Sequence, residues 1–240
     1  MTRIDSAFVL AAGLGARMRP LTLNRPKPLV ELCGKALIDH VLDRLAEAGV
    51  ETAAVNVHHF ADRLTRHLAG RHRPRIVICD ERDGLLDTGG GAANAMKAIG
   101  ERPFFTANSD SVWIEGARPA LPRLAERFNP ERMDCLMLLA SVVTAVGYDG
   151  AGDFSMDETG LLERRGEQPA VPFVYTGVAI VHPRLFDGAP EGAFSMNLLW
   201  DRALQTGRLY GMRHDGVWMH VGTPDALADA EIALRGRVSA

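Results

Sequence analysis

The sequence predicts an α/β protein whose sheet is mainly parallel and covered by helices on both faces. Its 240 residues, 47% of them hydrophobic, are enough to bury a large core. Short apolar runs alternate along the first half with segments of helical periodicity, as in consecutive β-α-β units. A glycine-rich turn follows the first apolar run, and parallel sheets bind ligands at the carboxyl ends of their strands. We therefore expect a ligand site at that turn.

The first half supplies the expected parallel strands. Its apolar runs are short, which is typical of strands buried on both faces, and the segments between them carry apolar residues at helical spacing. This pattern predicts strands at residues 7–12, 52–57, 75–79 and 103–107, and helices at residues 36–48 and 60–68.

The second half is expected to form a smaller lobe. The apolar run at residues 135–143 is its predicted strand, and a helix is predicted from Asp225. Residues 148–172, which follow this strand, are rich in glycine and charge. In the first half, three consecutive glycines from Gly89 to Gly91 predict a loop that leads into a helix.

The stretch from Gly13 to Pro28 is typical of a polyphosphate site. It holds four cations (Arg17, Arg19, Arg25, Lys27) and no acid. Glycines let backbone N–H groups approach an anion, and the cations neutralise its charge. No Gly-Lys-Ser/Thr follows, which excludes a P-loop, and Met18 stands where a dinucleotide fingerprint has its third glycine.

Lys27 is unusual in this composition. The chain has 27 lysines and arginines, of which three are lysines: Lys27, Lys35 and Lys97. Lys27 alone is framed by two prolines, which hold it more rigidly than an ordinary solvated loop lysine. We expect a compact cation to be needed there.

Charge and cysteine content limit the remaining classes of protein. A net charge of −3 disfavours a general nucleic-acid binder, whose surface would be basic. Three widely spaced cysteines fit reduced thiols better than disulfides or zinc ligands. The longest apolar run is too short to span a bilayer, and Asp5 interrupts any signal-like segment. We expect a cytoplasmic protein with no nucleic-acid or membrane partner, acting as a monomer or small homo-oligomer.

The segment from Gly13 to Thr22, followed by Pro-Lys-Pro-Leu, resembles the signature of the sugar-1-phosphate nucleotidyltransferases, and a looser resemblance covers almost the whole chain. Members join a nucleoside triphosphate to a sugar phosphate and release pyrophosphate. The resemblance implies one domain over residues 1–240 with a three-layer, Rossmann-like nucleotide-diphospho-sugar transferase fold and a mixed, predominantly parallel central sheet. Residues 1 to about 115 would bind the nucleotide, and residues from about 116 to 240 the sugar.

The resemblance also implies roles for individual residues near the nucleotide. Arg17 and Lys27 would be catalytic, holding the phosphates and neutralising their charge. Glu81 and Gly89 would hydrogen-bond the base, the latter in a segment resembling the family's Glu-Thr-Gly-Gly-Gly, with Asp87 in place of the glutamate. The implied nucleotide-binding residues are Leu10, Ala11, Ala12, Gly13, Gly15, Glu81 and Gly89. Asn56, a polar residue at an apolar strand end, needs a partner and is also expected near the site.

Asp110 is the predicted metal ligand. It follows an apolar strand, so it lies at the carboxyl edge of the sheet, and Mg²⁺ prefers carboxylate oxygens. Capping of a following helix is the alternative role. The family's second metal carboxylate falls at His220 here, which suits softer ions and makes Mn²⁺ an alternative to Mg²⁺. His220 would ligate the metal directly or hold a metal-bound water, or Asp153 or Asp215 would supply the second metal carboxylate in its place. A purely structural role for His220 is equally expected.

The sugar-binding candidates are Asn108, Asp153, Arg164 and Gly177. Gly177 lies in residues 173–181, a stretch that resembles the family strand whose backbone touches the sugar. A turn role for Asp153 and a solvated role for Arg164 are the alternatives.

Within the family, the chain resembles most the branch that joins UTP to N-acetylmuramate 1-phosphate for cell-wall recycling. Mannose-1-phosphate guanylyltransferase and glucose-1-phosphate thymidylyltransferase activities are the alternatives. A nucleotide-sugar-sensing subunit with weak catalysis, supported only by His220, is an alternative of another class, and a choline-phosphate cytidylyltransferase-like enzyme is a third.

Overall fold

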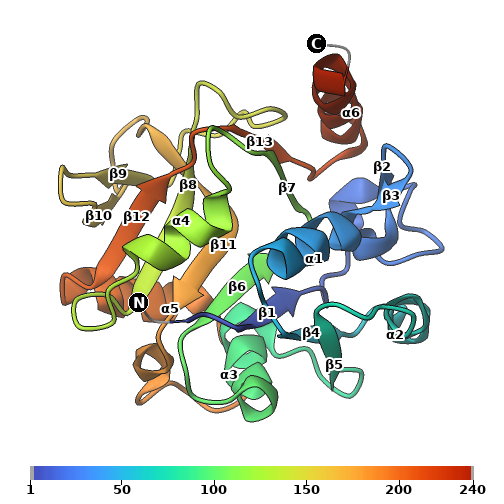
Figure 1. Cartoon of the computed structure of the whole chain (residues 1–240), viewed down its shortest axis with the longest axis horizontal. Coiled ribbons are helices and arrows are strands. Elements are labelled where there is room, and N and C mark those ends of the chain that lie inside the picture. The colour runs from blue at the N-terminus through green and yellow to red at the C-terminus, as the bar shows by residue number, and fades with distance from the viewer. Residues whose placement is uncertain (1–2, 239–240) are drawn as a thin grey trace.

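The computed structural model describes residues 3–238 and confirms the α/β fold with a mixed central sheet (Figure 1). The nine strands of this sheet are β1 (Ser6–Leu10), β4 (Thr52–Val57), β5 (Arg75–Asp80), β6 (Phe104–Asn108), β8 (Cys135–Ser141), β9 (Phe154–Met156), β10 (Leu162–Arg164), β11 (Phe173–Val181) and β12 (Leu209–Arg213). They follow the order β10-β9-β11-β6-β1-β4-β5, and β8 pairs with both β11 and β12.

The strands of the first half form the parallel part of the sheet. β1 lies between β4 and β6 and is parallel to both, and β5 continues the parallel set beyond β4. β11 then runs antiparallel to β6 and joins the second half of the chain to the first. The carboxyl ends of the four parallel strands therefore meet at one edge, and the start of β11 reaches that same edge.

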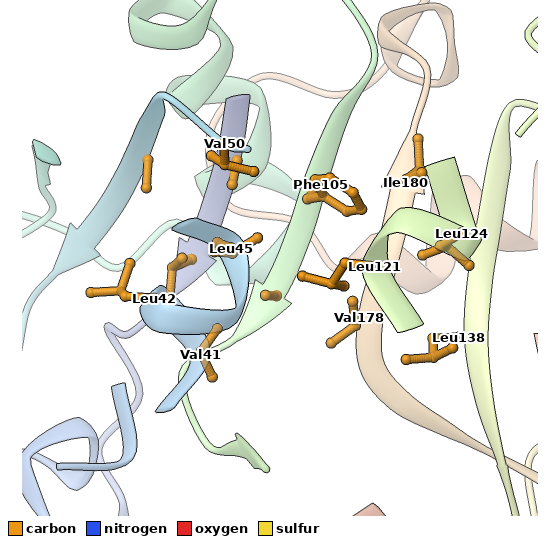
Figure 2. Close-up of a cluster of buried hydrophobic side chains, with 14 of the residues drawn as sticks. Val41, Leu42, Leu45, Val50, Phe105, Leu121, Leu124, Leu138, Val178 and Ile180 are labelled. Atoms are coloured by element: carbon orange, nitrogen blue, oxygen red, sulfur yellow. The ribbon is translucent and has the colours of Figure 1, made fainter. Parts of the chain in front are cut away.

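Helices cover both faces of the sheet. α1 (Leu37–Glu47), α2 (Ala61–Leu68) and α4 (Ala120–Arg127) bury their apolar sides on one face, while α3 (Asp87–Ile99) and α5 (Met196–Gln205) bury theirs on the other. Phe104 joins the second cluster and its neighbour Phe105 joins the first, as alternation along a strand requires. Figure 2 shows apolar side chains of α1 and α4 against those of the strands. None of the helices formed by residues 3–238 has the length and apolar character to cross a bilayer.

A third, smaller cluster lies beside the sheet. β7 (Ser111–Ile114) pairs antiparallel with β13 (Val217–His220), and β13 leads into α6 (Pro224–Val238), which stands at the upper right of Figure 1. Ala230 of α6 packs with Met18 and Leu37, next to the short strands β2 (Glu31–Leu32) and β3 (Lys35–Ala36). Residues from the two ends of the described chain thus share one core.

The prediction of a loop at Gly89 to Gly91 was wrong, because all three glycines lie within α3. Close packing explains why glycine occupies these helical positions. A Cβ on Gly89 would overlap the Phe194 ring, and a Cβ on Gly90 would overlap the Gly192 carbonyl oxygen. The segment before α5 crosses the first turn of α3 so closely that no side chain fits between them.

Two histidines, the buried His214 and the half-buried His40, give the fold a pH dependence. Burial lowers the pKa of His40 and of His214 below their ordinary value of 6.5. The unfolded chain therefore binds protons on these rings at a higher pH than the folded protein does. The free energy of unfolding should be highest above pH 6.5, where both rings are neutral in either state. It should decrease as the pH falls toward the pKa values of the folded protein.

Urea unfolding at about pH 7.5 and about pH 5.5 tests this expectation. His214→Gln should reduce the difference between the two conditions, whereas the exposed control His72→Gln should retain it. Equal stability of the wild-type protein at both pH values would contradict the prediction.

Candidate active site

A cavity of about 490 Å³ opens where the sequence predicts the ligand site, at the carboxyl ends of β1, β4 and β6. The loop after β1, the start of α3 and the turn between β6 and β7 form its walls. The predicted site residues that line it are Leu10, Ala11, Ala12, Gly13, Gly15, Arg17, Lys27, Asn108 and Asp110. Nine of the predicted residues, from three separate parts of the sequence, are thus brought together.

The loop after β1 is anchored by one side chain and shaped by one glycine. Met18 is fully buried in the cluster beside α6, whereas the adjacent Arg17 is exposed at the cavity. Gly15 has a φ of 62°, and a Cβ on it would lie 2.9 Å from the Cβ of Lys27. A left-handed backbone and this close approach both favour glycine. The loop therefore brings the Arg17 guanidinium and the Lys27 ammonium to one cavity.

Lys27 forms an ion pair with Asp110 at the cavity wall. Lys27 opens a short 3₁₀ turn between Pro26 and Pro28, and Pro28 is buried, so the backbone of the lysine is held firmly. The side chains are 15% and 28% exposed, so solvent screens their attraction less than it would on the open surface. A ligand in the cavity would meet a cation and a carboxylate side by side.

His220 lies next to this ion pair. Asp110 immediately precedes β7, and His220 of β13 is the register partner of Ser111, the first residue of β7. Burial lowers the pKa of His220, as do Lys27 and Arg17 to a smaller extent, while Asp110 raises it. The net effect favours the neutral imidazole, which is the form that coordinates a metal.

These donors fit a divalent cation that substrate phosphates help to hold. Among residues 3–238, no three His, Cys, Asp or Glu side chains gather as a complete metal cage. Mg²⁺ is commonly bound by one or two protein groups together with waters and phosphates. The two acids considered as substitutes for His220 are engaged elsewhere: Asp153 accepts the backbone N–H of Tyr175, and Asp215 pairs with Arg123.

The predicted sugar-binding residues fall into two groups. Asn108 lines the cavity, and Gly177 adjoins it, since a Cβ on Gly177 would lie 2.7 Å from the Asn108 Nδ2. Gly177 has a φ of 86°, so glycine is favoured on two counts. Asp153 and Arg164 lie outside the cavity lining, on or next to strands β9 and β10. Arg164 pairs with Asp201 of α5 and stacks over the Phe154 ring at 5.4 Å.

Glu81 and Gly89 lie behind the cavity wall. Glu81 is 2% exposed, and its carboxylate accepts hydrogen bonds from Asn56 and from the backbone of Leu86. The Gly89 N–H donates to the Phe194 carbonyl at 2.8 Å. Both groups predicted to contact the base therefore already have protein partners.

Other cavity residues were not predicted as site residues from the sequence. They are Ala16, Met18, Pro28, Leu85, Asp87, Thr88, Ser109 and Gly222. Asn56, expected only near the site, also lines the cavity. The sequence did indicate two of them: Thr88 is the first residue of the Thr-Gly-Gly-Gly segment, and Gly222 follows the candidate metal ligand His220 by two residues.

Sequence comparison finds both a family and close relatives. Residues 7–150 match the MobA-like NTP transferase domain. The chain is 50% identical over 232 residues to an N-acetylmuramate alpha-1-phosphate uridylyltransferase of Caulobacter vibrioides, covering 95% of this chain and 96% of the relative. It is 32% identical over 238 residues to the enzyme of the same name from Neisseria meningitidis serogroup B, covering 96% and 98%.

Comparison with solved structures finds the same fold. A UDP-glucose pyrophosphorylase complexed with UDP-glucose superposes with a TM-score of 0.79 at 16% identity, covering 98% of this chain and all of that chain (100%). HddC from Yersinia pseudotuberculosis, complexed with GMP-PN, superposes with a TM-score of 0.78 at 19% identity, covering 96% and 100%. At such identities, these likenesses show the fold alone.

Proposed function

Because the chain belongs to the sugar-1-phosphate nucleotidyltransferase family, we propose that it joins UTP to N-acetylmuramate 1-phosphate, giving a nucleotide-sugar and pyrophosphate. The observation that carries the substrate choice is the 50% identity, over almost all of both chains, to a relative named for this reaction. The cavity supports the chemistry, because Arg17, Lys27 and the amides after β1 converge where a triphosphate would bind.

The reaction requires two polyanions to approach each other. Like charges about 4 Å apart repel by several kcal/mol at a protein-like dielectric constant, so the site must neutralise them. A sugar-phosphate oxygen attacks the α-phosphorus in line, forming one P–O bond while the bond to the leaving pyrophosphate breaks. Arg17 and the Gly13–Gly15 amides hold the β- and γ-phosphates, and Lys27 neutralises charge on the α-phosphate. The nucleophile is already ionised, so no general base is needed.

A divalent cation, Mg²⁺ or Mn²⁺, is proposed to be held by Asp110 and His220. When bound, it would supply further positive charge to the phosphates. The residues of the chain provide the rest: Lys27 exchanges its pairing with Asp110 for contact with the α-phosphate, and Asn108 and Gly177 border the sugar. Asp153, just before β9, and Arg164, at the end of β10, are proposed to contact the sugar.

We also propose that residues 1–240 act as one domain, with the nucleotide held by residues up to about 115 and the sugar by residues from about 116. A monomer or a small homo-oligomer is proposed as the functional form. A nucleoside triphosphate substrate supports a cytoplasmic location.

Pyrophosphate release tests the proposal. The purified protein is offered each of four nucleoside triphosphates with a panel of sugar 1-phosphates, in Mg²⁺ and then in Mn²⁺. We expect turnover with UTP and N-acetylmuramate 1-phosphate, complete loss with EDTA, and recovery when the cation is restored.

The other outcomes of that panel are equally informative. Turnover with GTP and mannose 1-phosphate, or with dTTP and glucose 1-phosphate, would replace the proposed substrates. Nucleotide binding without turnover of any pair would instead favour a sensing subunit, and His220→Asp would then be the first variant to assay.

A further inference from the structure

A chain of three hydrogen bonds, two of them buried, links two walls of the cavity. The N–H of Ala11, in the loop after β1, donates to Asn56 Oδ1 at 2.6 Å. Asn56 Nδ2 donates to Glu81 Oε1 at 2.9 Å, and the N–H of Leu86, just before α3, donates to Glu81 Oε2 at 3.1 Å. The chain therefore runs from the wall that carries the phosphate-binding amides to the wall formed by the start of α3. We call Ala11, Asn56, Glu81 and Leu86 the relay.

The relay is a costly arrangement with a specific geometry. Asn56 and Glu81 are 4% and 2% exposed, and burying a carboxylate and an amide costs several kcal/mol unless each is hydrogen-bonded. Gly91 of α3 provides the space, because a Cβ there would lie 3.1 Å from Glu81 Oε1 and 3.2 Å from Asn56 Nδ2. An apolar pair could fill the same volume, but it could not hold two backbone N–H groups at fixed positions.

Both ends of the relay lead directly into the cavity lining. Ala11 itself lines the cavity and precedes Gly13 by two residues, and Leu86 is followed by Asp87 and Thr88, which also line it. Asn56 also lines the cavity, whereas Glu81 does not. The separation of the two walls is the dimension that a nucleotide between them must match.

We propose that Asn56 and Glu81 are positioning residues that set the spacing between the two nucleotide-binding walls. This inference rests on the proposed function in that it takes a nucleoside triphosphate as the ligand. Glu81 acts without touching the nucleotide, through the Asn56 amide at one oxygen and the Leu86 N–H at the other. Substitutions in the relay should therefore weaken nucleotide binding and leave the sugar side unchanged.

An exchange of the two side-chain types tests the relay. In Asn56→Asp, a carboxylate oxygen replaces the amide donor and faces an oxygen of Glu81, so that hydrogen bond is lost. In Glu81→Gln, the new amide NH₂ faces one of the two N–H groups from which Glu81 accepts hydrogen bonds in the wild-type protein. In the double variant, the carboxylate introduced by Asn56→Asp accepts from the Ala11 N–H and from the amide introduced by Glu81→Gln. The carbonyl of that amide accepts from Leu86, so all three hydrogen bonds are restored.

We expect each single variant to raise the UTP dissociation constant and the KM for UTP roughly tenfold, and the double variant to return both to within about threefold of wild type. The KM for the sugar phosphate should stay unchanged in all three proteins. Calorimetric titration with UTP, without sugar phosphate, gives the dissociation constant independently of turnover. Gly91→Ala, which displaces the relay without removing a hydrogen-bonding group, is the second variant should a single exchange fail to fold; it should raise the KM for UTP about threefold.

Two results would overturn the positioning role alone: single variants that melt earlier but bind UTP as the wild-type protein does, or a double variant that binds UTP no better than the poorer single variant. A wild-type protein that binds no nucleoside triphosphate would instead overturn the proposed function, and the positioning role with it.

Discussion

Lys27→Met is expected to lower kcat roughly a thousandfold while the protein stays folded. The lysine is the cation that the fold holds most firmly at the cavity, between two prolines and against Asp110. Methionine fills a similar volume but leaves the α-phosphate without a compensating charge when the pyrophosphate leaves. Because that interaction strengthens in the transition state, kcat should fall much more than the KM for UTP rises.

A matched control separates the role of Lys27 from a general loss of positive charge. Lys97→Met removes an exposed lysine from α3 and should leave kcat unchanged. The melting temperature of Lys27→Met should stay within about 4 °C of wild type, because a partly exposed ion pair contributes about 1 kcal/mol or less. Near-normal turnover by a folded Lys27→Met protein would remove this lysine from the mechanism.

Gly90→Ala is expected to destabilise the protein by about 3 kcal/mol or more. Alanine favours a helix over glycine by about 1 kcal/mol, so propensity alone predicts the opposite sign. The new methyl group would, however, overlap the backbone oxygen of Gly192, which cannot rotate away. The segment before α5 must then separate from the first turn of α3, with loss of the hydrogen bond from Gly90 N–H to the Phe194 carbonyl.

The control for Gly90→Ala is another glycine inside a helix. Gly236 of α6 has no atom within 4 Å of a Cβ placed on it, so Gly236→Ala should be neutral or stabilise by up to about 1 kcal/mol. Thermal and urea unfolding of the two variants measures the difference. A Gly90→Ala protein as stable as Gly236→Ala would contradict the prediction, because it would show that a methyl group fits between Gly90 and the Gly192 carbonyl oxygen.

The sequence predicted those features that depend on neighbouring residues. The strand at residues 52–57 is observed as β4 with the same bounds, because a short and mainly apolar run is typical of a buried strand. The strand at residues 173–181, expected from the family resemblance, is observed as β11. The loop after β1 was predicted as a ligand site for the same local reason, since its glycines and cations are consecutive in the sequence.

Features that depend on distant residues could not be predicted in this way. Gly89 and Gly90 were predicted to form a loop because the segment that packs against them comes about a hundred residues later. The sequence likewise cannot show that Glu81, predicted to contact the base, accepts hydrogen bonds from Asn56 and from the Leu86 N–H. The pairing of His220 with Ser111 also depends on a long-range strand contact, and the spacing of the residues does not indicate it.

The third cluster has a consequence for how the protein is made. A nascent chain that has emerged only through β8 already contains Lys27 and Asp110, but β7 lacks its partner strand and Met18 lacks the cover of α6. Apolar surface around Met18 stays open to chaperones or to aggregation until residues 217–236 emerge from the ribosome. The same residues bring Gly222 to the cavity, so the lining of the cavity is complete only after they have emerged.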